Sequence, residues 1–267
     1  MTGLVDSDLV VNRRHLPHRL DDGIAARAAI GLIVLATDQT IEHEFRRLLG
    51  LPGIAFYESR ILNDAAITPA TLAAMEARLT QATEVILPGL PLDVVAFGCT
   101  SASMVIGEER VFARIRAARP GVACTTPITA AFAAFEALGA RRIALLTPYR
   151  DDINDFMREY IEARGFAVPV MGSFNEEDDR RAARIDQASI RDAAIELGRA
   201  DAVDAVFVSC TSLRLLDAVG EIEAALGKPV TSSNHAMAWH CLGLAGIDDL
   251  RPACGALFTR RLAATAG

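Results

Sequence analysis

An internal repeat restricts the fold of this chain more than any other feature of its sequence. Residues 93–101 and 204–212 share the pattern Asp-x-Val-xxx-Cys-Thr-Ser. Similar apolar runs begin at Ile30 and Ile143, which lie 69 and 67 positions before the two repeated cysteines. Because these landmarks recur in one order and at nearly one spacing, the sequence predicts two related lobes. The long period excludes a solenoid of short repeats.

Within each half, short apolar runs alternate with stretches of helical periodicity, which is typical of βαβ units. The predicted fold is therefore α/β, with two pseudo-symmetric Rossmann-like lobes, each a mainly parallel sheet flanked by helices. We expect residues 1–120 and 230–267 to form the first lobe and residues 121–229 the second. The site should lie in the cleft between them, outside the carboxyl ends of the strands. Strands are expected at 30–36, 93–97, 122–124, 142–147, 168–170, 205–208 and 229–231, and helices at 68–82, 127–138, 151–164, 189–198 and 235–245.

Charge and composition exclude several classes of partner. The 267 residues carry a net charge of −7, which opposes nucleic-acid binding. The sequence has no apolar run of the ~18 residues that a membrane span needs. Residues 1–23 lack the apolar core of a secretory signal, so we expect a cytoplasmic protein. This segment is either an exposed arm with contacts in a homo-oligomer or a disordered tail.

The five cysteines form neither a disulfide framework nor a zinc site, because their number is odd and no CxxC pair occurs. Cys99 and Cys210 each follow a predicted strand and precede a predicted helix. There, backbone N–H groups and the helix dipole should lower the pKa of a thiol and favour its reactive thiolate. The neighbouring hydroxyls can cap the helices or donate to a substrate carboxylate; they belong to Thr100, Ser101, Thr211 and Ser212.

If the two lobes face each other, these loops place one sulfur on each side of a shared slot. One sulfur can then remove a proton from a planar carbon, or add to it, while the other delivers a proton. Such chemistry needs no metal and no organic cofactor if N–H and hydroxyl donors hold the developing charge. A single cysteine at a strand end would more often be a core residue, and Cys124, Cys241 and Cys254 are interpreted that way.

The chain resembles the aspartate/glutamate racemase superfamily, and within it the branch of maleate cis-trans isomerase, arylmalonate decarboxylase and the ectoine-utilisation protein A group. The resemblance rests on residues 31–42, 98–101, 146–149, 209–212 and 228–234. It implies a two-cysteine isomerase or racemase acting on a small carboxylate. In a maleate isomerase, the counterpart of Cys99 would add to the alkene carbon and that of Cys210 would handle the proton. The resemblance also implies substrate contacts for Tyr149 and Asn175.

Asp38, followed by Gln39, departs from the maleate isomerase pattern, which has Asn at the first position. A carboxylate there would repel a dicarboxylate and attract an amine or amidinium. This fits the ectoine-utilisation branch, where the substrate would be an ectoine-derived cyclic amidine or diamino acid. Asp38 can equally cap the helix that follows it, and both roles can hold at once.

Two further candidates and an acidic run complete the predicted site. Asn234 and His235 follow the last strand near the cleft and could contact substrate. His235 and His240 are five residues apart, which does not suit one metal. Residues 176–179 form an acidic run, expected in a solvated loop or in a lid over the cleft.

Other functions stay open: maleate isomerisation proper, decarboxylation of the arylmalonate type, or non-catalytic binding of a small molecule.

Overall fold

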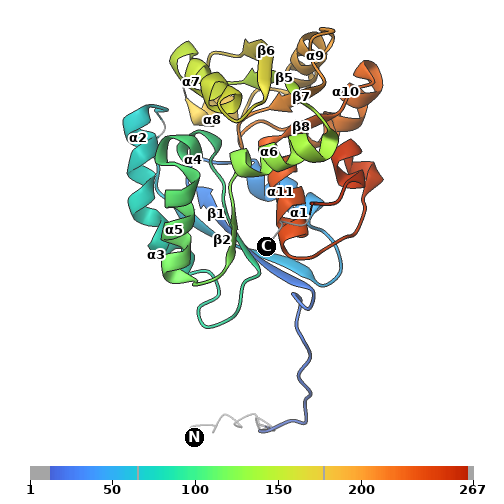
Figure 1. The fold of residues 1–267 in the computed structure, drawn as a ribbon. Coiled ribbons are helices and arrows are strands. Elements are labelled where there is room, and N and C mark those ends of the chain that lie inside the picture. The colour runs from blue at the N-terminus through green and yellow to red at the C-terminus, as the bar shows by residue number, and fades with distance from the viewer. Residues whose placement is uncertain (1–12, 65, 177, 264–267) are drawn as a thin grey trace, which may run out of the picture.

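The computed structural model describes residues 13–64, 66–176 and 178–263, and there the chain forms two four-stranded parallel sheets (Figure 1). The strand orders are β2-β1-β3-β4 and β6-β5-β7-β8, so the two halves pair their strands in the same relative order. This confirms the predicted two-lobed α/β fold. The strands are β1 (Ala28–Leu35), β2 (Ile54–Ile61), β3 (Val94–Phe97), β4 (Ala123–Thr125), β5 (Arg142–Thr147), β6 (Ala167–Ser173), β7 (Ala205–Val208) and β8 (Val230–Ser232).

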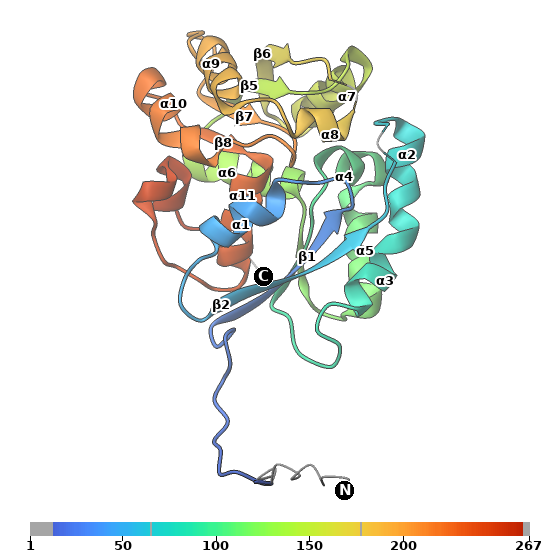
Figure 2. The same ribbon diagram turned by 180° about the vertical axis from the view of Figure 1, so that it is seen from behind.

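Helices connect the strands and cover the sheets (Figures 1 and 2). The stretch expected as one helix over 68–82 is divided into α2, the 3-10 helix η1 and α3. The helix expected from residue 189 begins earlier, with Asp186 as its N-cap. The helices are α1 (Ile41–Leu48), α2 (Pro69–Ala73), η1 (Ala74–Arg78), α3 (Leu79–Glu84), α4 (Thr100–Ile106), α5 (Glu108–Ala118), α6 (Pro127–Leu138), α7 (Asp151–Glu162), α8 (Asp179–Ala182), α9 (Gln187–Gly198), η2 (Leu216–Ala218), α10 (Val219–Leu226), α11 (Ser233–Leu244), η3 (Pro252–Cys254) and η4 (Ala256–Thr259).

The aspartate that opens each repeat has the same role in both lobes. The backbone N–H of Ala29 donates to Asp93 Oδ2 at 2.7 Å, and that of Arg142 donates to Asp204 Oδ2 at 2.9 Å. Each carboxylate thus ties the start of one central strand to the strand beside it. The repeat seen in the sequence therefore has an equivalent hydrogen bond in each sheet.

Helices α6 and α11 join the lobes, because they pack against each other and contribute to the apolar cores. Phe135 of α6 belongs to the core of the second sheet, whereas Ala130 and Ala134 of the same helix belong to the core of the first. α11 packs almost entirely buried beside β3, β4 and α1. The two sheets therefore share one continuous layer of helix.

Two strands, β4 and β8, belong to the opposite lobe from the one that the predicted boundaries assign them to. β4 pairs with β3 in the first sheet, although the expected boundary at 120/121 assigns it to the second lobe. β8 pairs with β7 in the second sheet, although the boundary at 229/230 assigns it to the first. The predicted lobe boundaries are therefore wrong at these two strands, because each is an edge strand of the sheet formed by its own half of the chain.

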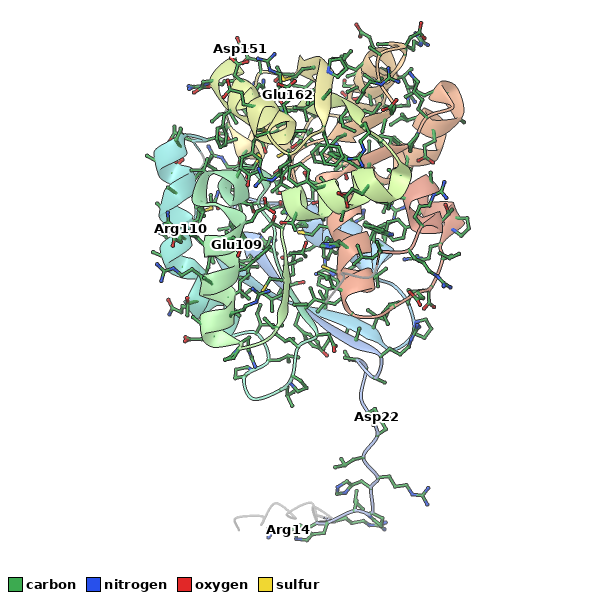
Figure 3. All side chains as sticks on the ribbon, in the orientation of Figure 1. Arg14, Asp22, Glu109, Arg110, Asp151 and Glu162 are labelled. Atoms are coloured by element: carbon green, nitrogen blue, oxygen red, sulfur yellow. The ribbon has the colours of Figure 1, made fainter. Side chains whose placement is uncertain are left out.

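The N-terminal segment extends away from both lobes in the part that the structure describes, as Arg14 and Asp22 show in Figure 3. Residues 1–12, which belong to the expected arm, lie outside the described residues. Within the described ranges, no helix combines the length and the apolar character needed to cross a membrane.

Candidate active site

Cys99 and Cys210 lie at the carboxyl ends of β3 and β7 and line the same cavity between the lobes. Equivalent backbone bonds of 2.8 Å hold the residue before each cysteine to the neighbouring strand; Gly98 N donates to Ile33 O, and Ser209 N donates to Leu146 O. The space open to the centre of a water-sized molecule is about 20 Å³, which is room for about one water. The structure thus shows the site closed.

The cavity wall combines polar groups near the sulfurs with an apolar side. Thr100, Ser101 and Thr211 line it beside the cysteines, as the repeated motif suggests, and Tyr149 lines it from the end of β5. The Sγ of Cys99 lies 3.8 Å from the Ser101 Oγ. The apolar side comes from Leu35, Ile67, Leu72 and Met75.

Ser233, at the start of α11, links the two cysteine loops. Its Oγ accepts a hydrogen bond from the backbone N–H of Cys210 at 3.1 Å and lies 2.8 Å from the Thr100 Oγ1. One fully buried hydroxyl therefore fixes the two halves of the site relative to each other. Ser233 lies within residues 228–234, but no local sequence pattern identifies it as a site residue.

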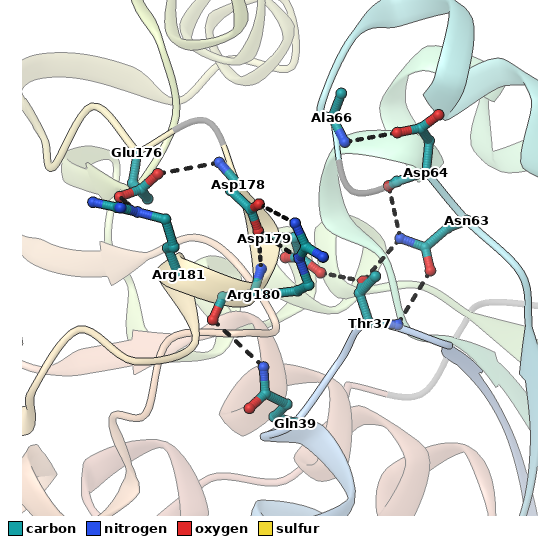
Figure 4. A network of polar contacts seen from close by, with 10 residues as sticks. All are labelled: Thr37, Gln39, Asn63, Asp64, Ala66, Glu176, Asp178, Asp179, Arg180 and Arg181. Atoms are coloured by element: carbon teal, nitrogen blue, oxygen red, sulfur yellow. Dashed lines mark hydrogen bonds and ion pairs between the residues drawn. The ribbon is translucent and has the colours of Figure 1, made fainter.

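Asp179 is a second residue that the sequence analysis misses. It begins α8 within the acidic run, yet it is only 7% exposed and lines the cavity. Its Oδ1 accepts a hydrogen bond from Ser212 Oγ at 2.8 Å. Its Oδ2 accepts one from the Thr37 hydroxyl across the lobe boundary, as Figure 4 shows. None of the described residues that line the cavity is Lys, Arg or His.

The two thiols are held in a neutral state. Burial raises the pKa of Cys99 to about 12, while the Ala102 N–H and the Ser101 hydroxyl act in the opposite direction. Burial also raises the pKa of Cys210, and the nearby Asp179 adds to this increase. The expectation of lowered thiol pKa values is therefore wrong for both cysteines. At Cys99, desolvation of a thiolate outweighs the effect of the N-terminus of α4. The sequence predicts a helix directly after Cys210, but a turn follows it and the next helical segment, η2, begins only at Leu216.

Tyr149 lies next to Cys210 in the closed site. Its side chain is 4% exposed, and burial raises the pKa of its hydroxyl. The same hydroxyl lowers the pKa of the Cys210 thiol, so it lies where a donor can stabilise the thiolate. The Asn154 Nδ2 donates to the Tyr149 carbonyl at 2.8 Å and holds this loop.

Asp38 lies beside the cavity without lining it. Its Oδ1 accepts the backbone N–H groups of Thr40 at 2.7 Å and Ile41 at 2.9 Å. Its Oδ2 is buried and accepts no hydrogen bond from the described residues. Burial raises the pKa of this carboxyl to about 6. Of the two roles that the sequence leaves open, the structure shows the capping of α1.

The structure does not bring five other predicted residues to the cavity. Ser212 is buried and donates its hydroxyl to Asp179 without lining the cavity. Gln39 is exposed and donates to the Arg180 carbonyl at 3.5 Å, and Asn175 is exposed with a positive φ of 51°. The buried Asn234 donates from its Nδ2 to the carbonyl of Thr211, which supports a cavity loop from behind. His235 donates from its Nε2 to the Cys254 carbonyl at 2.7 Å and does not line the cavity.

No three His, Cys, Asp or Glu side chains group as metal ligands in the part of the chain that is described.

Fold and site together define a class: a two-lobed α/β protein with a pair of thiols on one closed cavity between its lobes. Comparison with known proteins extends this class to a family. The sequence model of arylmalonate decarboxylase matches residues 30–258, so the chain belongs to that family.

Individual relatives agree with this assignment. Arylmalonate decarboxylase from Bordetella bronchiseptica is 36% identical over 140 residues, which cover 52% of this chain and 58% of that protein. Maleate isomerase from Pseudomonas putida is 29% identical over 86% of this chain and 96% of the relative. A Nocardia farcinica maleate cis-trans isomerase mutant with a covalently bound succinylcysteine intermediate superposes with a TM-score of 0.79 at 26% identity, covering 87% of this chain and 98% of that one.

These relatives confirm the predicted membership of the racemase-like superfamily and its maleate isomerase-like branch. They place the chain among isomerase-type enzymes of that branch, as the sequence predicts. The ectoine-utilisation group stays a prediction, and so do the roles of the individual site residues.

Proposed function

We propose that the chain is an isomerase or racemase in which Cys99 and Cys210 act from opposite sides on one carbon of a small carboxylate substrate. The observation that carries the proposal is their repeat-equivalent placement on a single cavity. Support also comes from the succinylcysteine intermediate in the Nocardia farcinica relative. We also propose a cytoplasmic location, because the reducing conditions there suit the five free cysteines. The chain is further proposed to form a homo-oligomer.

The proposed proton transfer uses one thiolate and one thiol. The thiolate removes a proton from the carbon next to the carboxylate, and the opposite thiol gives its proton to the other face. One thiolate and one thiol are present before and after, with their positions exchanged. In a cis-trans isomerisation, the Cys99 sulfur would instead add to the alkene carbon while the Cys210 thiol protonates its neighbour. Hydroxyls of Ser101 and Thr211 can stabilise the enolate-like charge.

For the substrate, we propose an amino- or amidine-bearing carboxylate, in the class of ectoine catabolites. Support comes from the charges, since Asp179 lines the cavity and Asp38 lies beside it. Both raise the pKa of the Cys99 thiol, so both act on the reacting groups. A dicarboxylate such as maleate would face these two carboxylates at short range.

The test is proton exchange with solvent deuterium. We expect Cys99→Ser and Cys210→Ser each to lower deuterium incorporation into ectoine-derived amino acids by about 10²–10⁴-fold, the usual size of an acid–base contribution. NMR of the substrate measures the incorporation. Cys124→Ser is the matched control, because Cys124 is buried in β4 but lies outside the cavity. Exchange that survives both active-site changes contradicts the proposal.

The same assay separates the alternative functions. Faster exchange into maleate than into any amino-bearing compound favours maleate isomerisation. Carbon dioxide release from an arylmalonate favours decarboxylation, the activity named for the 36% identical relative. Binding without exchange into any compound indicates a binding protein.

A further inference from the structure

Asp179 brings a negative charge from the second lobe into the cavity. It is 7% exposed, and both of its oxygens accept hydrogen bonds from hydroxyls, those of Ser212 and Thr37. A carboxylate has about four acceptor sites, so these two bonds leave capacity on each oxygen. The residue can therefore accept a further donor from a molecule in the cavity.

No cation among the described residues balances this charge. The arginines that follow Asp179 are engaged outside the cavity, since Arg180 pairs with Asp178 and Arg181 pairs with Glu176 (Figure 4). A buried charge without an opposite charge is costly. A positively charged group in the cavity would offset that cost.

Asp38 cannot serve this purpose from its present position. It does not line the cavity. Its Oδ1 accepts two backbone N–H groups at the start of α1, and its Oδ2, which accepts no hydrogen bond from the described residues, is buried without lining the cavity. Arg60 also lies near enough to interact with its charge. Asp64 also lines the cavity, but it is exposed and its Oδ1 accepts the backbone N–H of Ala66. The buried charge that faces the cavity is therefore that of Asp179.

We propose that Asp179 binds a positively charged nitrogen of the substrate and so determines which charge the thiol cavity accepts. The inference rests on the proposed function and deepens it. The ligand class is a small carboxylate that also carries an ammonium or amidinium group. An amidinium suits the position well, because its planar N–H donors pair with a carboxylate as those of arginine do.

Binding of such a cation would also prepare the thiols. Asp179 contributes to the raised pKa of both Cys99 and Cys210. A cation bound against Asp179 offsets this contribution and favours loss of a thiol proton. Substrate binding and thiol activation would thus be one event.

The experiment compares the binding of two probes by isothermal titration calorimetry: 2,4-diaminobutyrate, which carries two ammonium groups, and succinate, which carries none. Wild-type protein should bind the diamino acid more tightly. Asp179→Asn should weaken that binding by about 10- to 100-fold, the range of a charge-assisted hydrogen bond, and should not weaken succinate binding. Asp155→Asn removes the same charge from the exposed face of α7, outside the cavity, and should change neither affinity.

The ratio of the two affinities is the decisive readout, because a general loss of structure would weaken both probes alike. An unchanged ratio in Asp179→Asn overturns the inference. A wild-type protein that binds neither probe, or prefers succinate, overturns it as well. If the ratio shifts as expected but no compound exchanges deuterium, Asp179 is the cation site and the proposed isomerase function fails alone.

Discussion

At the scale of single residues, the two active-site thiols are protected rather than exposed. Cys99 is 5% exposed and Cys210 is 3% exposed, and burial raises the pKa of both. Thiolate is the reactive form, so an external reagent meets two barriers, access and protonation. Such protection suits a site whose sulfurs react only when a substrate is enclosed.

Alkylation tests this protection. With limited iodoacetamide near neutral pH, we expect Cys254 to be labelled first, because it is the one cysteine that is not fully buried. Cys99 and Cys210 should react at least about 10-fold more slowly, as followed by peptide mass spectrometry. Cys241, wholly buried in α11, provides the slow reference. Labelling of Cys99 as fast as that of Cys254 would show that the site is open or its thiol activated.

The residues that sequence reasoning finds are those fixed by local pattern. Cys99 and Cys210 stand out because a strand-end motif occurs twice, and the motif brings its Thr and Ser neighbours with it. Asp179 and Ser233 are missed because their positions depend on contacts between distant segments. Nothing in the local sequence separates Asp179 from the other acidic residues of the run.

At the scale of secondary structure, the start of α1 shows how one carboxylate serves a helix. Asp38 satisfies two N–H groups of the first turn but is itself buried. The direction of a helix similarly explains why His235 does not reach the cavity. Chain proximity to β8 suggests the cleft, yet α11 turns the ring toward the Cys254 carbonyl. Sequence distance from a strand end cannot show that rotation.

Asp38→Asn should make protein stability less sensitive to pH. In the folded chain, the carboxyl pKa rises from 3.8 to about 6, so the folded state binds this proton more tightly than the unfolded state. The resulting stabilisation is present below pH ~4 and is lost as pH rises through 6, by up to about 3 kcal/mol. In Asp38→Asn, the amide oxygen can still accept the two N–H bonds at the start of α1, and the pH-dependent loss of stability is absent.

Urea unfolding between pH 4 and pH 7 measures the effect. The free energy of unfolding of Asp38→Asn should rise relative to that of the wild type across this range. Asp22→Asn, on the exposed N-terminal segment, should follow the wild type. A constant difference between Asp38→Asn and wild type would mean that Asp38 is ionised in the folded protein over the whole range.

At the scale of the whole molecule, polar contacts join the two lobes outside the cavity. Glu44 of α1 accepts the backbone N–H groups of Leu215 and Leu216, each at 2.9 Å. Thr40 donates to the Ser212 carbonyl at 2.9 Å. The central α6–α11 layer and these contacts connect the two lobes. The loops over the cavity meet through a smaller contact, an isolated antiparallel bridge between Ala66 and Asp178.

Because the closed cavity has room for about one water, a substrate can enter only if part of its cover moves. We expect the cover to open at the bridge between Ala66 and Asp178, which joins an exposed and a half-buried residue of the two lobes. Cα atoms paired in an antiparallel bridge lie about 4.5–5.5 Å apart, within the range that a disulfide spans. The double variant Ala66→Cys/Asp178→Cys should therefore form a cross-link that keeps the cavity closed.

We expect the oxidised double variant to lose at least about 10-fold in deuterium exchange activity, because substrate admission requires the loops to separate. Dithiothreitol should restore the activity, and each single cysteine variant should respond to neither treatment. Non-reducing mass spectrometry verifies the cross-link. Full activity in the cross-linked protein would mean that the substrate enters by another route, through movement of the lobes about the α6–α11 layer rather than through the bridge.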